Sequence, residues 1–312
     1  MKKCKILLLF SLTFGLILLC SCKDNHHNNL STDKNLEIVT SFYPVYAITK
    51  EICGNLNDVR MINSINGIHS YEPSAADIKA INDSDVFIFH SRTLESWARN
   101  LKETFNNEQV KIIEASDGLN LKRVQGLEDI EVTEGIDEKS LYDPHTWLDP
   151  ILVKDEARII AQKLSELDPK NKKEYLKNAD TFGKEVIEIS SNYDERFKKV
   201  KSRTFVTQHT AFSYIAERYN LKQLGISGIE DEEPSPKRMA EISEFVKENN
   251  VKTIFAEPQT SRKKAETVAK STGAKIKILN PLEADPQNNK RYLENLEDTL
   301  NTIAEDLEGD KQ

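Results

Sequence analysis

Short β-rich runs alternate with helical patterns along this chain, and that alternation limits the possible folds more than any other feature. In the first half, strands are predicted at 36–41, 58–63, 86–89 and 110–115. Helical patterns lie between them at 45–53, 74–81 and 94–105, and Ser74 with Asp77 offers a capping box for the second helix. A β-α-β-α order of this kind predicts a parallel sheet flanked by helices.

The second half of the chain has the same alternation of strands and helices, although no sequence repeat is evident. Strands are predicted at 204–208, 221–225, 251–256 and 275–279. Helices are predicted at 211–219, 235–249, 261–271 and 290–307, and Pro236 occupies the first position of the second of these. We therefore predict an α/β protein with two Rossmann-like (β/α)4 lobes, 36–167 and 202–312.

A long helical pattern over 168–201 separates the two halves. Before it, 151–167 is helical, and Asp168-Pro169 then supplies an N-cap with proline at the first helical position. Apolar residues recur at spacings of three and four from Tyr175 to Val200, and one helix of this length would extend about 45 Å at roughly 1.5 Å per residue. This is too long to cover one small sheet, so we predict a rigid helix that joins two lobes. A helical hairpin broken near Gly183 is the alternative.

The first 21 residues have the pattern of an export signal. A basic start precedes an apolar run over 6–19, which is too short for a membrane-spanning helix. The ending Leu19-Cys20-Ser21-Cys22 resembles the lipobox of bacterial lipoproteins. The resemblance implies cleavage before Cys22 and a lipid on its sulfur, which would hold the protein on the outer face of a Gram-positive cell membrane. A secreted protein without the lipid is the alternative.

The polar segment 22–35 lacks apolar periodicity and predicts a flexible tether. The formal net charge of −8 becomes −11 once the three lysines of the signal are removed, which argues against nucleic-acid binding because that needs a basic face. Of four cysteines, only Cys22 and Cys53 remain after cleavage. With Cys22 acylated, Cys53 has no partner within the chain, so neither a disulfide framework nor a cysteine-rich metal site is expected.

The six histidines indicate where the chemistry lies. His26 and His27 belong to the tether, and His90 ends a predicted strand. His69, His145 and His209 each lie in or beside a loop where a β segment gives way to a helix. Because open α/β sheets bind ligands beyond the carboxyl ends of their strands, these side chains from both lobes could converge.

A carboxylate from the second lobe would complete the set. After the predicted strand 275–279, the chain offers Glu283 and Asp285 in the same topological position as the loop with His209. Three imidazoles and one carboxylate suit tetrahedral zinc, whereas two histidines and two carboxylates would favour manganese or iron. Since neutral imidazoles are required, the affinity for metal is expected to fall as the pH drops through about 6.

Three segments resemble the histidine motifs of the metal-binding lipoproteins that serve ABC importers, the cluster A-I solute-binding proteins. They are Gly67-Ile68-His69-Ser70-Tyr71-Glu72-Pro73-Ser74, Asp143-Pro144-His145-Thr146-Trp147-Leu148-Asp149-Pro150 and Thr207-Gln208-His209-Thr210-Ala211-Phe212. The segments 225–229 and 233–236 also match, and the similarity covers essentially the whole chain from about Leu36. Within the family, the chain is most similar to the zinc-specific, laminin-binding surface lipoproteins of Gram-positive cocci.

The resemblance implies that His69, His145 and His209 bind Zn²⁺ and that Glu283 is the fourth ligand, although some relatives use an aspartate aligned near Asp285. The manganese-binding branch has a glutamate in place of His209, which supports zinc over manganese or iron. The implied function is a monomeric, non-enzymatic protein that delivers zinc to an ABC permease, with laminin adhesion as the alternative or an added role.

Two further alternatives stay open from the residues themselves. A zinc hydrolase would need an open coordination position and a general base, but four protein ligands would close the site and no H-E-x-x-H motif is present. The histidine-rich loop of many zinc-specific relatives has no counterpart at 120–140, which contains no histidine. We hypothesise that His26 and His27 in the tether collect zinc instead; a solvated polar linker is the simpler interpretation.

Overall fold

The structure is a computed structural model that describes residues 34–62, 67–101, 110–124 and 141–309. The predicted export signal, Cys22, His26 and His27 lie outside the described residues, as do parts of the predicted 94–105 helix and of the 120–140 loop. None of the helices formed by the described residues has the length and apolar character needed to cross a membrane.

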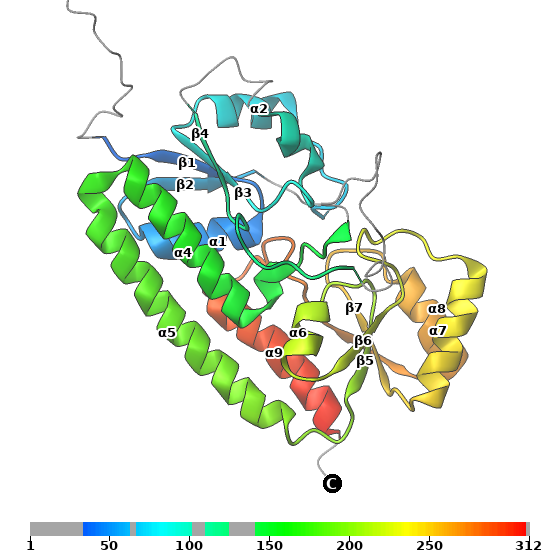
Figure 1. Ribbon diagram of the computed structural model, residues 1–312. Coiled ribbons are helices and arrows are strands. Elements are labelled where there is room, and N and C mark those ends of the chain that lie inside the picture. Colours follow the sequence, from blue (N-terminus) through cyan, green and yellow to red (C-terminus); the bar gives the residue numbers. More distant parts are fainter. Residues whose placement is uncertain (1–33, 63–66, 102–109, 125–140, 310–312) are drawn as a thin grey trace, which may run out of the picture.

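Each half of the chain forms a four-stranded sheet in which every pairing is parallel (Figure 1). The first has the order β2-β1-β3-β4 and consists of β1 (Glu37–Thr40), β2 (Asp58–Met61), β3 (Val86–Phe89) and β4 (Lys111–Glu114). The second has the equivalent order β6-β5-β7-β8 and consists of β5 (Thr204–Thr207), β6 (Lys222–Gly225), β7 (Thr253–Ala256) and β8 (Lys275–Ile278). The predicted fold class of two parallel α/β lobes is confirmed.

The helices divide between the outer faces of the lobes and the region between them (Figure 1). They are α1 (Tyr43–Cys53), α2 (Ala75–Asn82), α4 (Pro150–Leu167), α5 (Lys172–Phe197), α6 (Ser213–Arg218), α7 (Pro236–Glu248), α8 (Lys263–Thr272) and α9 (Tyr292–Glu308). Short 3-10 helices cover Ser96–Asn100, Thr146–Leu148 and Pro169–Asn171. The predicted capping box of α2 is present, because Ser74 accepts from the backbone N–H of Asp77 and the Asp77 carboxylate accepts from that of Ser74.

Two helix predictions differ from the structure in detail. Within the predicted 94–105 helix, Ser96–Asn100 is a 3-10 helix and Leu101 is α-helical, while 102–105 lie outside the described residues. Asp168-Pro169 begins a single 3-10 turn, and α5 starts three residues after Pro169, at Lys172. The Asp168 carboxylate accepts hydrogen bonds from Tyr175 Oη and Asn171 Nδ2, both at 2.7 Å, so it is engaged by side chains and caps no backbone N–H.

The connecting helix α5 is a single element of 26 residues that passes through Gly183 without a break, which excludes the helical hairpin. It runs beside α4 and along both lobes (Figure 1). Its buried face points towards α1, α4 and α9 and comprises Tyr175, Ala179, Phe182, Gly183, Val186, Tyr193 and Phe197.

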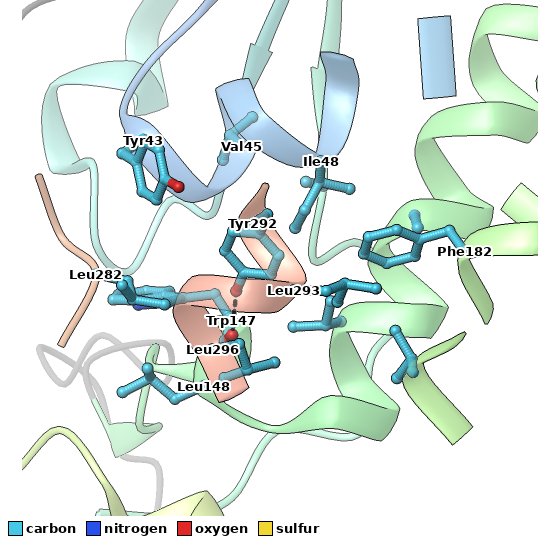
Figure 2. Packing of buried hydrophobic residues seen from close by; sticks show 14 of the residues in the cluster. Tyr43, Val45, Ile48, Trp147, Leu148, Phe182, Leu282, Tyr292, Leu293 and Leu296 are labelled. Atoms are coloured by element: carbon cyan, nitrogen blue, oxygen red, sulfur yellow. Dashed lines mark hydrogen bonds between the residues drawn. The ribbon is translucent and has the colours of Figure 1, made fainter. Parts of the chain in front are cut away.

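One apolar cluster continues from the first lobe into the second. It contains Ile38 and Ile48 of the first lobe, Phe205 and Phe255 of the second, and the inner faces of α4, α5 and α9. Figure 2 shows side chains of α9 between those of α1 and the segment that follows His145; the labelled residues are Tyr43, Val45, Ile48, Trp147, Leu148, Phe182, Leu282, Tyr292, Leu293 and Leu296. Separate smaller clusters fill the outer side of each lobe. Because the shared cluster is large and apolar, the lobes are held together as one body.

The end of β6 is packed too closely for any side chain at Gly225. An added Cβ would lie 2.6 Å from the carbonyl oxygen of Ser227 and 2.8 Å from the backbone nitrogen of Thr210. We predict that Gly225→Ala lowers the free energy of unfolding by about 1–3 kcal/mol, measured by urea denaturation.

Gly183→Ala is the matched control, because its Cβ would meet only the flexible side chain of Lys154, at 3.2 Å. Alanine favours a helix interior over glycine by about 1 kcal/mol, so this variant should be as stable as the wild type or more stable. Equal stability of Gly225→Ala and the wild type would contradict the close packing described for β6.

Candidate metal centre

Four side chains meet where the carboxyl ends of the two sheets face each other. His69 lies between β2 and α2, and His145 directly precedes the 3-10 helix Thr146–Leu148. His209 follows β5, and Glu283 follows β8. One nitrogen or oxygen atom from each of the four lies within 4.8 Å of the others. The structure therefore brings together the four residues that the sequence singled out, two from each lobe.

The Glu283 carboxylate is the centre of this cluster. Its Oε1 lies 3.0 Å from His209 Nε2, 3.4 Å from His69 Nε2 and 3.5 Å from His145 Nε2. The Nε2 atoms of His69 and His145 are 3.4 Å apart. Tetrahedral zinc with bonds of about 2.0–2.1 Å to nitrogen and oxygen would place its ligand atoms roughly 3.3 Å apart, so the donor set fits this ion closely.

Carboxylates also hold the outer nitrogens of two imidazoles. His145 Nδ1 donates to Asp143 Oδ1 at 2.7 Å, and His209 Nδ1 donates to Glu257 Oε1 at 2.5 Å. Asp143 and Glu257 are both buried. In the neutral imidazole, a carboxylate acceptor fixes the tautomer with a proton on Nδ1, so that the Nε2 lone pair can bind a metal.

The third imidazole, that of His69, has different surroundings. His69 Nδ1 is buried and has no hydrogen-bond partner among the described residues. The Glu230 Oε2 atom lies 3.6 Å from it, beyond normal hydrogen-bond distance. Glu230 belongs to the segment between β6 and α7, so this pair connects the two lobes.

Trp147 closes the inner side of the cluster. Its ring centroid lies 5.0 Å from that of His145, and it is fully buried. The indole N–H donates to the carbonyl of Pro281 at 2.8 Å, which ties the loop of Glu283 to the first lobe. The hydroxyl of Tyr292 donates to the Trp147 carbonyl (Figure 2). The centre is thus shielded from water on this side, which strengthens electrostatic interactions within it.

Charge attraction within the cluster shifts its protonation equilibria. Burial by itself lowers the pKa of His69, but the nearby carboxylates of Glu230 and Glu283 outweigh it and raise the pKa to about 9. Burial likewise opposes the charge on His209, yet Glu283 and Glu257 raise its pKa well above the ordinary value. The pKa of Glu283 is raised by burial but lowered more strongly by the three imidazoles, His209 foremost, to well below its usual range. A metal ion that binds here must displace protons from His69 and His209.

Other residues considered in the sequence lie outside the cluster. Asp285 accepts from the backbone N–H of Gln287 at 2.8 Å and is not part of the cluster, which includes Glu283 instead. His90 is fully buried behind the loop of His145, where its Nε2 donates to the Pro144 carbonyl at 2.7 Å.

Sequence reasoning did not assign roles to Asp143 or Glu230. Asp143 stands two residues before His145 in a motif that was singled out, and the spacing was the available signal. Glu230 opens an acidic run, Glu230-Asp231-Glu232-Glu233, whose composition is that of a solvated surface segment. Its position beside His69 depends on how the lobes pack.

Comparison with known proteins places this arrangement in a family. The family described as zinc-uptake complex component A, periplasmic (ZnuA) matches residues 38–306. The zinc-binding lipoprotein AdcA of Streptococcus pneumoniae is 35% identical over 320 residues, which cover 99% of this chain and 62% of AdcA. The high-affinity zinc uptake system protein ZnuA of Bacillus subtilis is 33% identical over 315 residues, which cover 98% of both proteins.

Solved structures agree with the sequence comparison. A Zn(II)-bound variant of AdcAII from Streptococcus pneumoniae is 57% identical with a TM-score of 0.81, and covers 88% of this chain and 99% of its own. The laminin-binding protein Lmb of Streptococcus agalactiae is 54% identical with a TM-score of 0.80, and covers 88% of this chain and all of its own. Because the family match spans most of the chain, this protein belongs to the ZnuA family of zinc-uptake complex components.

Proposed function

We propose that this protein captures Zn²⁺ outside the cytoplasm and delivers it to an ABC permease, with His69, His145, His209 and Glu283 as the ligands. The observation that carries this proposal is the meeting of four donor atoms, from both lobes, within 4.8 Å of one another. Three imidazoles and one carboxylate are a donor set suited to zinc, and four protein ligands suit a site that binds rather than catalyses.

The geometry favours a carrier over a zinc hydrolase. A catalytic zinc needs an open coordination position and a free general base nearby. Here Glu283 faces all three Nε2 atoms, so four protein donors fill the site, and Asp143 and Glu257 are engaged with imidazole Nδ1 atoms. The remaining carboxylate named near the site, that of Glu230, lies beside the outer Nδ1 of His69. The relatives named as zinc-binding and zinc-uptake proteins point the same way. The chain spans 62% of AdcA, so the transport role is inferred for the part that the two proteins share.

Attachment to the membrane through a lipid on Cys22 belongs to the same proposal. AdcA is described as a lipoprotein, and the lipobox-like sequence ends at Cys22. The polar segment 22–35 would then separate the folded body from the membrane surface.

Release of zinc is expected to use local movement of the second-lobe loop 281–289. The apolar cluster shared by the lobes opposes a wide hinge motion. The loop is joined to the first lobe by the hydrogen bond from Trp147 to Pro281, which such a movement would break.

Adhesion to laminin is a second candidate function. The observation in its favour is the similarity to Lmb of Streptococcus agalactiae and to the laminin-binding protein Lbp of Streptococcus pyogenes, at 54% and 52% identity. Binding of the purified protein to immobilised laminin, compared with and without a zinc chelator, would test it. Absence of saturable binding in both conditions would remove this candidate.

Loss of His209 should abolish tight zinc binding. Changes to residues that merely support a metal ligand reduce affinity by about 10–100-fold, so loss of a ligand itself should reach or exceed the upper end of that range. We predict one zinc per wild-type chain by elemental analysis and, by calorimetry, an affinity of His209→Ala weaker by about 100-fold or more. Zinc binding of this variant with wild-type affinity would contradict the ligand assignment.

Substitutions of the two carboxylates of the same loop distinguish the fourth ligand. Glu283→Gln removes the carboxylate at the centre of the cluster and should weaken zinc binding by at least about 10-fold in chelator competition. Asp285→Asn is the matched control, because the Asp285 side chain lies outside the cluster and accepts from the backbone N–H of Gln287, which an amide oxygen can also do. A larger loss of zinc affinity in Asp285→Asn than in Glu283→Gln would instead identify Asp285 as the fourth ligand.

Zinc binding should release protons at neutral pH. With the pKa of His69 raised to about 9, this imidazole is protonated at pH 7.5 and must lose its proton to offer Nε2 to a metal. Apparent affinity should therefore rise with pH up to about 9, and its loss on acidification should begin well above the pH of about 6 expected for free imidazoles. Calorimetry in buffers with different ionisation enthalpies measures the released protons; a buffer-independent enthalpy would contradict the prediction.

A further inference from the structure

The three imidazoles of the cluster differ in how their outer nitrogens are held. The pair His145–Asp143 lies within the first lobe, and the pair His209–Glu257 lies within the second. Their carboxylate side chains are 3% and 5% exposed. Both hydrogen bonds are therefore short and shielded from solvent, and each joins two residues of the same lobe.

The corresponding contact of His69 is long, exposed and between lobes. Glu230 Oε2 lies 3.6 Å from His69 Nδ1, and the Glu230 side chain is 61% exposed. The Nδ1 atom itself is buried without a hydrogen-bond partner among the described residues, which is costly for a polar group. A shift of a few tenths of an ångström would bring the Glu230 carboxylate into hydrogen-bond distance.

The segment that carries Glu230 is anchored by its neighbours. Lys264 Nζ donates to Ser227 Oγ and to the Asp231 carbonyl, both at 2.8 Å, and pairs with the Asp231 carboxylate at 3.0 Å. Glu232 accepts from the backbone N–H of Gly228 at 3.1 Å. These contacts fix the backbone on both sides of Glu230, while its own side chain remains free to engage His69.

We propose that Glu230 is a positioning residue that acts on zinc through His69. It accepts the Nδ1 proton of His69 from the opposite lobe, holds the Nε2 of this ligand towards the metal and thereby slows the escape of zinc. Because this contact lies at the surface, it can open without disturbing the buried pairs of His145 and His209. This inference rests on the proposed zinc-binding function and adds to it the ligand that controls release.

Zinc release tests the proposal directly. In the folded protein loaded with one zinc, transfer to an excess of a chromogenic chelator is followed by stopped flow. Glu230→Ala should accelerate release by about 10-fold or more, the usual effect of removing a partner of a ligand histidine, with little change in the association rate. Glu230→Gln, which keeps a neutral acceptor, should release zinc at an intermediate rate.

Glu233→Gln is the matched control. It removes the same charge from the same segment, and the Glu233 side chain is 82% exposed, 3.9 Å from Lys264 Nζ. It should release zinc at the wild-type rate. If Glu233→Gln accelerated release as much as Glu230→Ala, the effect would come from the loss of any negative charge in this segment, and the proposal would be wrong. Release from Glu230→Ala at the wild-type rate would also overturn it.

A double-mutant cycle separates a positioning role from an independent one. In a His69→Ala background, Glu230→Ala should cause no further acceleration, because its route of action is already absent. The same acceleration in both backgrounds would overturn the proposal. A wild-type protein that retains no zinc would instead overturn the proposed function, so the two failures are distinguishable.

Discussion

The apolar cluster shared by the two lobes is the constraint on which the rest of the structure depends. Side chains of α4, α5 and α9 pack with residues of both sheets, so the carboxyl ends of the two sheets are held at a fixed separation. Only with that separation fixed can Glu283 of the second lobe approach His69 and His145 of the first to within 3.5 Å. The site is therefore a product of the core, since neither lobe contains it alone.

The polar centre has to be stable in contact with this core. A buried carboxylate is costly unless charges and hydrogen bonds compensate it. Glu283 is compensated by three imidazoles, and their mutual attraction lowers the pKa of Glu283 while raising those of His69 and His209. Protons and a divalent cation are thus alternative partners for the same preorganised donors, which links zinc binding to pH.

Much of this arrangement could be predicted from the sequence, because it depends on local patterns. The alternation of strands and helices predicted the two sheets, and the positions of His69 after β2 and of His209 after β5 placed both residues at the correct edge. The residues by themselves left Glu283 and Asp285 open, and only the family resemblance favoured Glu283, because their positions depend on a turn in which Leu282 adopts a left-handed φ of 58°. Leucine gives no sign of such a turn. The start of α5 was also missed. Asp168 was expected to cap the helix, but its carboxylate accepts a hydrogen bond from the Tyr175 side chain, a contact that the local sequence does not indicate.

A carrier must bind its metal tightly and still release it, and this fold divides those requirements between different parts of the site. Because the shared core opposes domain opening, any exchange of ligands has to occur through segments with few buried contacts. The imidazoles of His145 and His209 are each hydrogen-bonded to a buried carboxylate of their own lobe, so these two ligands are held in place whether or not the lobes move. The third faces an exposed carboxylate of the other lobe, that of Glu230, whose Oε2 lies 3.6 Å from His69 Nδ1. Because the pair of His69 and Glu230 is the most exposed of the three, His69 is the ligand that can leave first, and the loop of Glu283 can follow. The core, His145 and His209 remain in place.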